Sequence, residues 1–103
     1  MRKIAEIVEE IHEELEGAEH YATKAAQYKG TEKDLSSVYA GLATTELSHV
    51  DTLHSQVVKA INEQKAAGKE VPAGMQDVWD WQHKQITAKY AGIKALLEMA
   101  KKP

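Results

Sequence analysis

Apolar residues recur at alternating steps of three and four along most of the chain, and no stretch shows the alternation that marks a β-strand. This spacing gathers apolar side chains on one face of a helix. Glycine or proline and polar residues cluster at "KGTEKD", residues 29–34, and at "AAGKEVPAG", residues 66–74. The sequence therefore predicts an all-α fold with helices over about residues 3–29, 32–67 and 73–101.

The two clusters also carry signals for where helices begin. Thr31 is predicted to be the N-cap of the second helix, with Asp34 three residues later in a variant of the capping box. Pro72 is predicted to lie where the chain restarts into the third helix. We expect residues 1–103 to form a single domain, because no linker divides the chain and its length suits one small core.

Each predicted helix has one apolar stripe that we expect to face the core. In the first helix the stripe comprises Ile4, Ile7, Ile11, Glu14, Ala18, Tyr21, Ala25 and Tyr28. In the second helix it comprises Leu35, Tyr39, Leu42, Glu46, His49, Leu53, Val57 and Ala60. In the third helix it comprises Met75, Trp79, His83, Ile86, Tyr90, Ile93, Leu97 and Ala100.

Composition excludes several classes of protein. The net charge is −3 with acids and bases mixed along the chain, so no nucleic-acid partner is expected. Cysteine is absent, which excludes disulfides, thiolate metal sites and cysteine nucleophiles. The N-terminal run "MRKIAEIVEEIHEE" carries acids where a signal peptide needs apolar residues, and no apolar run could span a membrane. We therefore expect a cytoplasmic protein without a membrane partner.

Ionisable residues interrupt two of the stripes at mid-helix, as Glu14 in the first helix and Glu46 with His49 in the second. A buried carboxylate needs a cation, a proton or water beside it, because burying it alone costs several kcal/mol. Residues three apart lie one turn from each other, so Glu46 and His49 could hold one ion. Carboxylate oxygen with imidazole nitrogen suits iron, manganese or zinc. The sequence predicts a metal site here; the alternative is a water-filled polar layer that fixes helix register.

The spacing of Glu46 and His49 does not single them out, since other histidines also follow an acid by three residues: Glu9–His12, Asp51–His54 and Asp80–His83. Position on the stripe separates these pairs. His12 is predicted to lie on a solvated charged face, and His54 to be half-buried and hydrogen-bonded. His83 lies on its stripe near Trp79 and is predicted to be a hydrogen-bonded core histidine, with a metal ligand as the open alternative.

Glu14 and the Glu46-x-x-His49 pair amount to half of a known ligand set. Di-iron carboxylate proteins with four-helix bundles take one Glu from each of two helices and one Glu-x-x-His from each of the other two. A two-fold dimer would complete both the four-helix bundle and the ligand set. We therefore predict a homodimer or higher homo-oligomer that binds two iron ions per subunit pair, with manganese or zinc as alternatives.

The run "HEELEGAEHY", residues 12–21, followed by "ELSH", residues 46–49, resembles the encapsulated ferritins, a family of ferritin-like di-iron carboxylate proteins. The resemblance implies an antiparallel helical hairpin that dimerises, and a ferroxidase that oxidises Fe(II) to Fe(III) for iron storage or detoxification. By the same resemblance, the following residues have roles: Glu14, Glu46 and His49 as ferroxidase ligands shared between subunits, Glu13 and Glu16 as carboxylates that capture Fe(II), and Tyr21 as a tyrosine beside the centre.

Some features depart from that family. His20 stands where the family has a tryptophan, and the predicted third helix is longer than the family's C-terminal helix. The family implies an encapsulin shell as partner and a protein nanocompartment as location. The tail "LLEMAKKP", however, carries no Gly-Ser-Leu peptide of the type that directs such proteins into the shell.

Two other functions fit the sequence. One is a redox-silent zinc or manganese site with a structural purpose. The other is a metal-free helical oligomer or adaptor whose contact surface includes Trp79, Trp81 and Tyr90.

Overall fold

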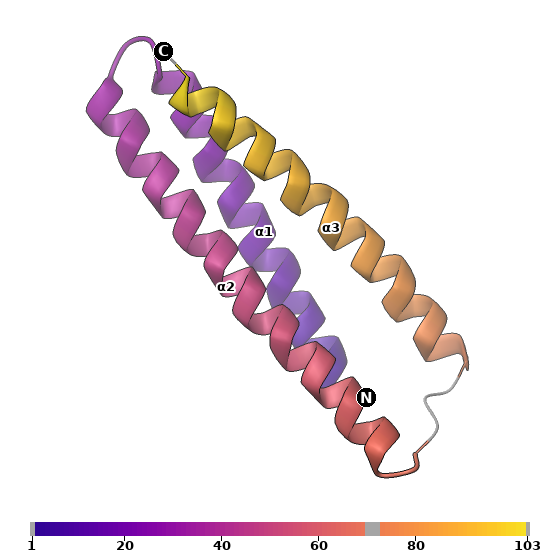
Figure 1. Ribbon diagram of the computed structural model, residues 1–103. Coiled ribbons are helices and arrows are strands. Elements are labelled where there is room, and N and C mark those ends of the chain that lie inside the picture. The colour runs from indigo at the N-terminus through magenta and orange to yellow at the C-terminus, as the bar shows by residue number, and fades with distance from the viewer. Residues whose placement is uncertain (1, 70–72, 103) are drawn as a thin grey trace.

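Three long helices lie side by side in the computed structural model, which describes residues 2–69 and 73–102 (Figure 1). They are α1 (Arg2–Tyr28), α2 (Lys33–Ala66) and α3 (Ala73–Lys101). The first and third run in the same direction and α2 runs opposite to both, which gives a rod of 56 × 18 × 17 Å. The all-α prediction is confirmed, and each helix begins and ends within a residue of its predicted bounds. None of the described helices has an apolar stretch long enough to cross a membrane.

The turn between α1 and α2 differs from the predicted capping box. The Tyr28 carbonyl accepts hydrogen bonds from the backbone N–H groups of Thr31 and Glu32, at 3.2 and 2.9 Å. Glu32 is the N-cap of α2, and no side chain caps that end of the helix. The prediction of Thr31 as N-cap is wrong, because the turn uses Thr31 to close on α1 and α2 begins one residue later.

Glycine ends α2 in a Schellman arrangement. Gly68 has φ of 72°, in the left-handed region that glycine adopts without strain. Its N–H donates to the Lys65 carbonyl at 3.1 Å, and the Lys69 N–H donates to the Gln64 carbonyl at 3.1 Å. These bonds satisfy carbonyls that the end of the helix would otherwise leave unpaired. The predicted restart at Pro72 lies outside the described residues.

The core is centred on α1, which packs against α2 on one side and α3 on another. Its buried residues are Ile4, Val8, Ile11, Leu15, Ala18, Ala22 and Ala25. Half of the predicted stripe is therefore confirmed, whereas Ile7, Glu14, Tyr21 and Tyr28 are only half-buried. The reason is that α1 contacts two helices, so its buried face extends toward α3 and away from these four side chains.

The predicted stripe of α2 is displaced by about one residue. The buried positions of α2 are Ser36, Ala43, Leu47, Val50 and Val57, of which the prediction contained only Val57. Leu42, predicted to face the core, is 41% exposed. Since successive residues point about 100° apart, this displacement moves Glu46 and His49 from the centre of the core to its edge.

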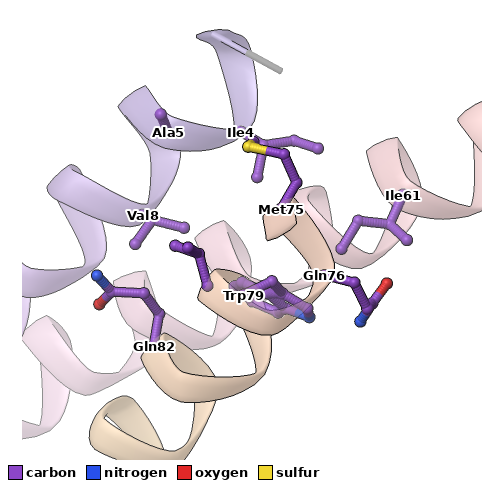
Figure 2. Close-up of a pocket in the computed structure, with 9 residues that line it drawn as sticks. Ile4, Ala5, Val8, Ile61, Met75, Gln76, Trp79 and Gln82 are labelled. Carbon is purple, nitrogen blue, oxygen red and sulfur yellow. The ribbon is translucent and has the colours of Figure 1, made fainter. Parts of the chain in front are cut away.

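In α3 the predicted core residues Ile86, Ile93 and Leu97 are buried. Near its N-terminal end an apolar groove of about 160 Å³ separates α3 from the other helices. Figure 2 shows Met75 and Trp79 of α3 facing Ile4 and Val8 of α1 and Ile61 of α2 around this groove. The groove contains no ionisable side chain, so it offers no site for the chemistry predicted above.

Ser36 ties the start of α2 to the end of α1. Its buried hydroxyl donates a hydrogen bond of 2.6 Å to the Ala25 carbonyl. We expect Ser36→Ala to lower the free energy of unfolding by about 0.5–1.5 kcal/mol, because the bond is lost in a buried site. Urea unfolding followed by circular dichroism measures this change. The control is Ser37→Ala, since Ser37 is exposed and should change stability by less than about 0.5 kcal/mol.

Candidate metal centre

Glu14 of α1 meets Glu46 and His49 of α2 near the middle of the antiparallel pair. The His49 Nδ1 atom lies 3.2 Å from Glu14 Oε2 and 3.9 Å from Glu46 Oε1. One potential ligand atom from each of the three residues lies within 4.8 Å of the others. Within residues 2–69 and 73–102, this is the only group of three or more such side chains that could hold a metal ion.

A glycine on α1 makes room for this cluster. Gly17 lies one turn after Glu14, and a Cβ at that position would be 2.9 Å from Glu46 Oε2. Real Cβ atoms essentially never approach an oxygen so closely, so the carboxylate occupies space that only glycine leaves free. Glycine inside a helix costs up to about 1 kcal/mol relative to alanine. The need to leave room for the Glu46 carboxylate explains why a glycine stands inside this helix despite the cost.

The cluster lies at the edge of the core. The predicted stripes had implied that it would lie inside the core, and that prediction is wrong. The side chains of Glu14 and Glu46 are 29% and 27% exposed, and that of His49 is 50% exposed. Two features place the cluster at the edge: the buried face of α2 is displaced by about one residue, and the buried face of α1 extends toward α3. In one chain, therefore, the three ligands open onto the surface.

That surface is the side of the α1–α2 pair away from α3. His12 of α1 contacts Gln82 of α3, and Asp51 of α2 contacts Tyr90 of α3. Residues two apart in a helix point about 200° apart, so Glu14 and His49 point away from α3. We call this surface the open face. Its half-buried or partly exposed apolar side chains are Ile7, Tyr21, Tyr39, Leu42 and Leu53.

Further acids border the cluster. Glu10 and Glu13 line a surface hollow together with Glu14, His49 and Leu53. Glu13, predicted to capture Fe(II), is thus beside the ligands, whereas Glu16 is exposed and does not line the hollow. Glu10, which lies four residues before Glu14, was not among the residues predicted from the sequence. The spacing of four residues could have indicated Glu10, because residues four apart lie on the same face of a helix.

Tyr21 and His20 lie one to two turns beyond the cluster on α1. The Tyr21 ring stacks on Tyr39 at 6.0 Å, and the His20 ring is tilted against Tyr21 at 5.6 Å. Tyr21 forms no hydrogen bond with Glu14, Glu46 or His49. Its predicted place beside the centre as a hydrogen-bonding group is therefore not observed in the single chain, and its ring packs on the open face.

The two carboxylates lie close enough for each to change the pKa of the other. A hydrogen bond between them raises the pKa of Glu46, and burial and the nearby Glu14 charge raise it further. The same bond lowers the pKa of Glu14, with His49 adding to the effect and burial opposing it. Two close acids repel each other when both are ionised, and protonation of one of them relieves that repulsion. A divalent cation would relieve the same repulsion.

The arrangement fits a metal ion with small adjustments. Donor atoms about 2.0–2.2 Å from one ion lie roughly 3–3.5 Å from each other. The distance of 3.2 Å from His49 Nδ1 to Glu14 Oε2 is already in that range. The distance of 3.9 Å from His49 Nδ1 to Glu46 Oε1 is slightly longer than that range. Oxygen and imidazole donors of this kind suit iron, manganese and zinc. Comparisons of the chain with protein-family models, curated proteins and solved structures give no match.

The other histidines differ from their predictions. His12 is half-buried and hydrogen-bonded to Gln82 Oε1 at 2.6 Å, so its assignment to a solvated face is wrong. His54 is half-buried as predicted, but it has no hydrogen bond with any described residue. His83 is exposed, so its prediction as a core histidine is wrong. Packing of α3 mainly on α1 leaves the His83 position uncovered.

The raised pKa of Glu46 makes the stability of the metal-free protein depend on pH. Because the pKa of Glu46 is raised on folding, the unfolded chain releases this proton first as pH rises, and the contribution of Glu46 to stability falls between the ordinary and the raised pKa. The lowered pKa of Glu14 adds a contribution that is lost as pH falls. An amide at this position can donate to Glu14 without a proton from solution. In the presence of a chelator, we expect Glu46→Gln to raise the Tm by about 2–5 °C at pH 7 and to leave it unchanged near pH 4.

The control for this comparison is Glu13→Gln, which replaces an exposed acid of α1 next to Glu14 and should leave the pH profile of the Tm unchanged. Thermal unfolding of the three proteins followed by circular dichroism provides the data. A Glu46→Gln protein that is less stable than the wild type at pH 7 would contradict a repulsion between Glu14 and Glu46.

Proposed function

We propose that the protein is a ferroxidase of the encapsulated-ferritin type, in which two chains share one di-iron centre. The observation that carries the proposal is the cluster of Glu14, Glu46 and His49 on the open face. One chain offers half of the ligands that a di-iron bundle uses. The open face leaves them at the surface, where a second copy related by a two-fold axis could bring the other half.

The apolar side chains around the cluster support the dimer. Ile7, Tyr21 and Leu53 pack partly against the core of their own chain and leave part of their surface uncovered. Tyr39 stacks on Tyr21 and is also only half-buried. Covering them with the same face of a second chain would bury apolar area around the metal ligands. Four carboxylates from two chains would then offset the charge of two Fe(II) ions. Metal binding and dimerisation should therefore favour each other.

The reaction needs two electrons from two Fe(II) ions and dioxygen as their acceptor. With two protons from water, the products are two Fe(III) ions and hydrogen peroxide. The residues of this chain hold the ions side by side, and Glu10 and Glu13 raise the local concentration of the cation through their charge. The ferric product would pass to a recipient, for which an encapsulin shell is the candidate that the family suggests.

The test is Fe(II) oxidation in air by the metal-free protein, followed by ferric absorbance, with the oligomer measured by sedimentation. We expect oxidation well above the rate in buffer, saturating near two irons per dimer in the first phase. Saturation at one iron per chain in a monomer would contradict the shared centre. Oxidation no faster than in buffer would exclude the ferroxidase, and metal analysis would then separate a zinc or manganese site from a metal-free oligomer.

A further inference from the structure

Two histidines lie close together between α2 and α3, on the side of the α1–α2 pair opposite to the open face. The ring centres of His54 and His83 are 5.2 Å apart with an angle of 34° between the planes. Trp79 closes the group, with its ring centre 5.5 Å from that of His83 and 6.0 Å from that of His54. Among the described residues, α2 and α3 have few other contacts, one of which is the hydrogen bond between Tyr90 and Asp51.

The separation of the two imidazoles suits a shared ion. A zinc-type ion binds imidazole nitrogen at about 2.0–2.1 Å, and in tetrahedral geometry two such rings have centres about 5 Å apart. Neither ring has a hydrogen bond with any described residue, so their nitrogens are not committed elsewhere. Burial lowers the pKa of His54, and nearby His83 lowers it further while Asp51 opposes the change. Neutral imidazole is the form that binds metal.

The acids near these histidines are committed to other contacts. Asp51, three residues before His54, accepts a hydrogen bond from the Tyr90 hydroxyl at 3.1 Å. Asp80, three residues before His83, accepts one from Gln76 at 3.0 Å. The pair therefore supplies two nitrogen donors without a carboxylate, unlike the cluster on the open face. Such a donor set favours copper, nickel or zinc over manganese or magnesium.

We propose that His54 and His83 form a separate site for a borderline divalent cation (Cu²⁺, Ni²⁺ or Zn²⁺), completed by water, which cross-links α3 to α2. The site does not depend on the ferroxidase centre, because it uses other residues on another side of the bundle. A bound ion would hold the N-terminal half of α3 against α2, where the two helices have few other contacts.

Trp79 provides a reporter, since Cu²⁺ quenches tryptophan fluorescence at short range. The experiment uses the full chain with Trp81→Phe, which leaves Trp79 as the only tryptophan, and with Glu46→Gln and His49→Asn to disable the other cluster. We expect micromolar Cu²⁺ to quench most of the Trp79 fluorescence, to saturate at one ion per chain and to be reversed by EDTA. Zn²⁺ should raise the Tm of the same protein.

Adding either His54→Asn or His83→Asn should weaken both effects at least tenfold. Adding His20→Asn, which replaces an exposed histidine on α1, should leave them unchanged and serves as the control. His83 is exposed, so its variant should fold even if the His54 variant does not, and circular dichroism checks both. Quenching that does not saturate, or that persists at full strength in the His83→Asn protein, would overturn the proposal.

Discussion

Fe(II) oxidation is expected to fall at least about 100-fold when Glu46 is replaced by alanine or His49 by asparagine, because each change removes two ligands from the proposed centre shared by two chains. Loss of even an outer hydrogen-bonding partner of a metal ligand commonly costs 10-fold or more in affinity or activity. The loss here should be larger, because the substitution removes the donor atom itself from both subunits.

The controls match these variants in residue type and lie on α1. Glu19→Ala and His20→Asn replace exposed side chains of α1 that lie outside the cluster, and both should oxidise Fe(II) at the wild-type rate. Stopped-flow absorbance gives the rates, and titration gives the number of irons bound. Equal rates in the wild type, Glu46→Ala and His49→Asn proteins would place the oxidation somewhere other than at this cluster.

The same variants separate the proposed dimer from a metal-free oligomer. If metal joins the subunits, Zn²⁺ should shift the wild type toward the dimer in sedimentation, and the His49→Asn protein should not respond. A metal-free oligomer would instead dimerise equally with and without Zn²⁺. It would also become tighter in the Glu46→Ala protein, because that change removes a repelling acid from the interface.

The spacing of apolar residues was enough to predict the three helices and their ends, because turns rich in glycine and polar residues bound each segment. It was not enough to predict the rotation of α2. Both Leu42 and Leu47 are apolar, and the pattern does not show which of them meets a neighbouring helix. Packing of Ala43, Leu47 and Val50 against α1 decides the matter, and it leaves Leu42 41% exposed.

The cluster was nonetheless predicted from the sequence, although its depth was not. Glu14 and the Glu46–His49 pair lie on the same edge of an antiparallel helix pair, so they meet even though neither is in the centre of the core. The contact of His54 with His83 could not be predicted, because it depends on how α3 packs beside α1 and α2. The role of Gly17 could have been suspected from the sequence, because a glycine inside a helix is unfavourable unless a neighbouring group needs the space.

Gly17 leads to the second large effect. We expect Gly17→Ala to weaken Fe(II) or Zn²⁺ binding by about 10-fold, because the new methyl group forces the Glu46 carboxylate away from Glu14 and His49. The protein itself should not be destabilised. The atom in the way is the far end of a flexible side chain, which can move, and alanine favours the helix over glycine by up to about 1 kcal/mol.

Gly92→Ala separates these two effects, since Gly92 lies inside α3 with no atom within 4 Å of where its Cβ would be. Both variants should raise the Tm of the metal-free protein, because both remove a glycine from a helix interior. Only Gly17→Ala should weaken metal binding in calorimetric titrations. Wild-type affinity in the Gly17→Ala protein would mean that the Glu46 carboxylate binds metal from another position, and the role of Gly17 would then be excluded. If Gly17→Ala lowers the metal affinity but not the Tm, damage to the fold cannot be the cause. The substitution strengthens the helix, so the loss of affinity must come from the displaced Glu46 carboxylate.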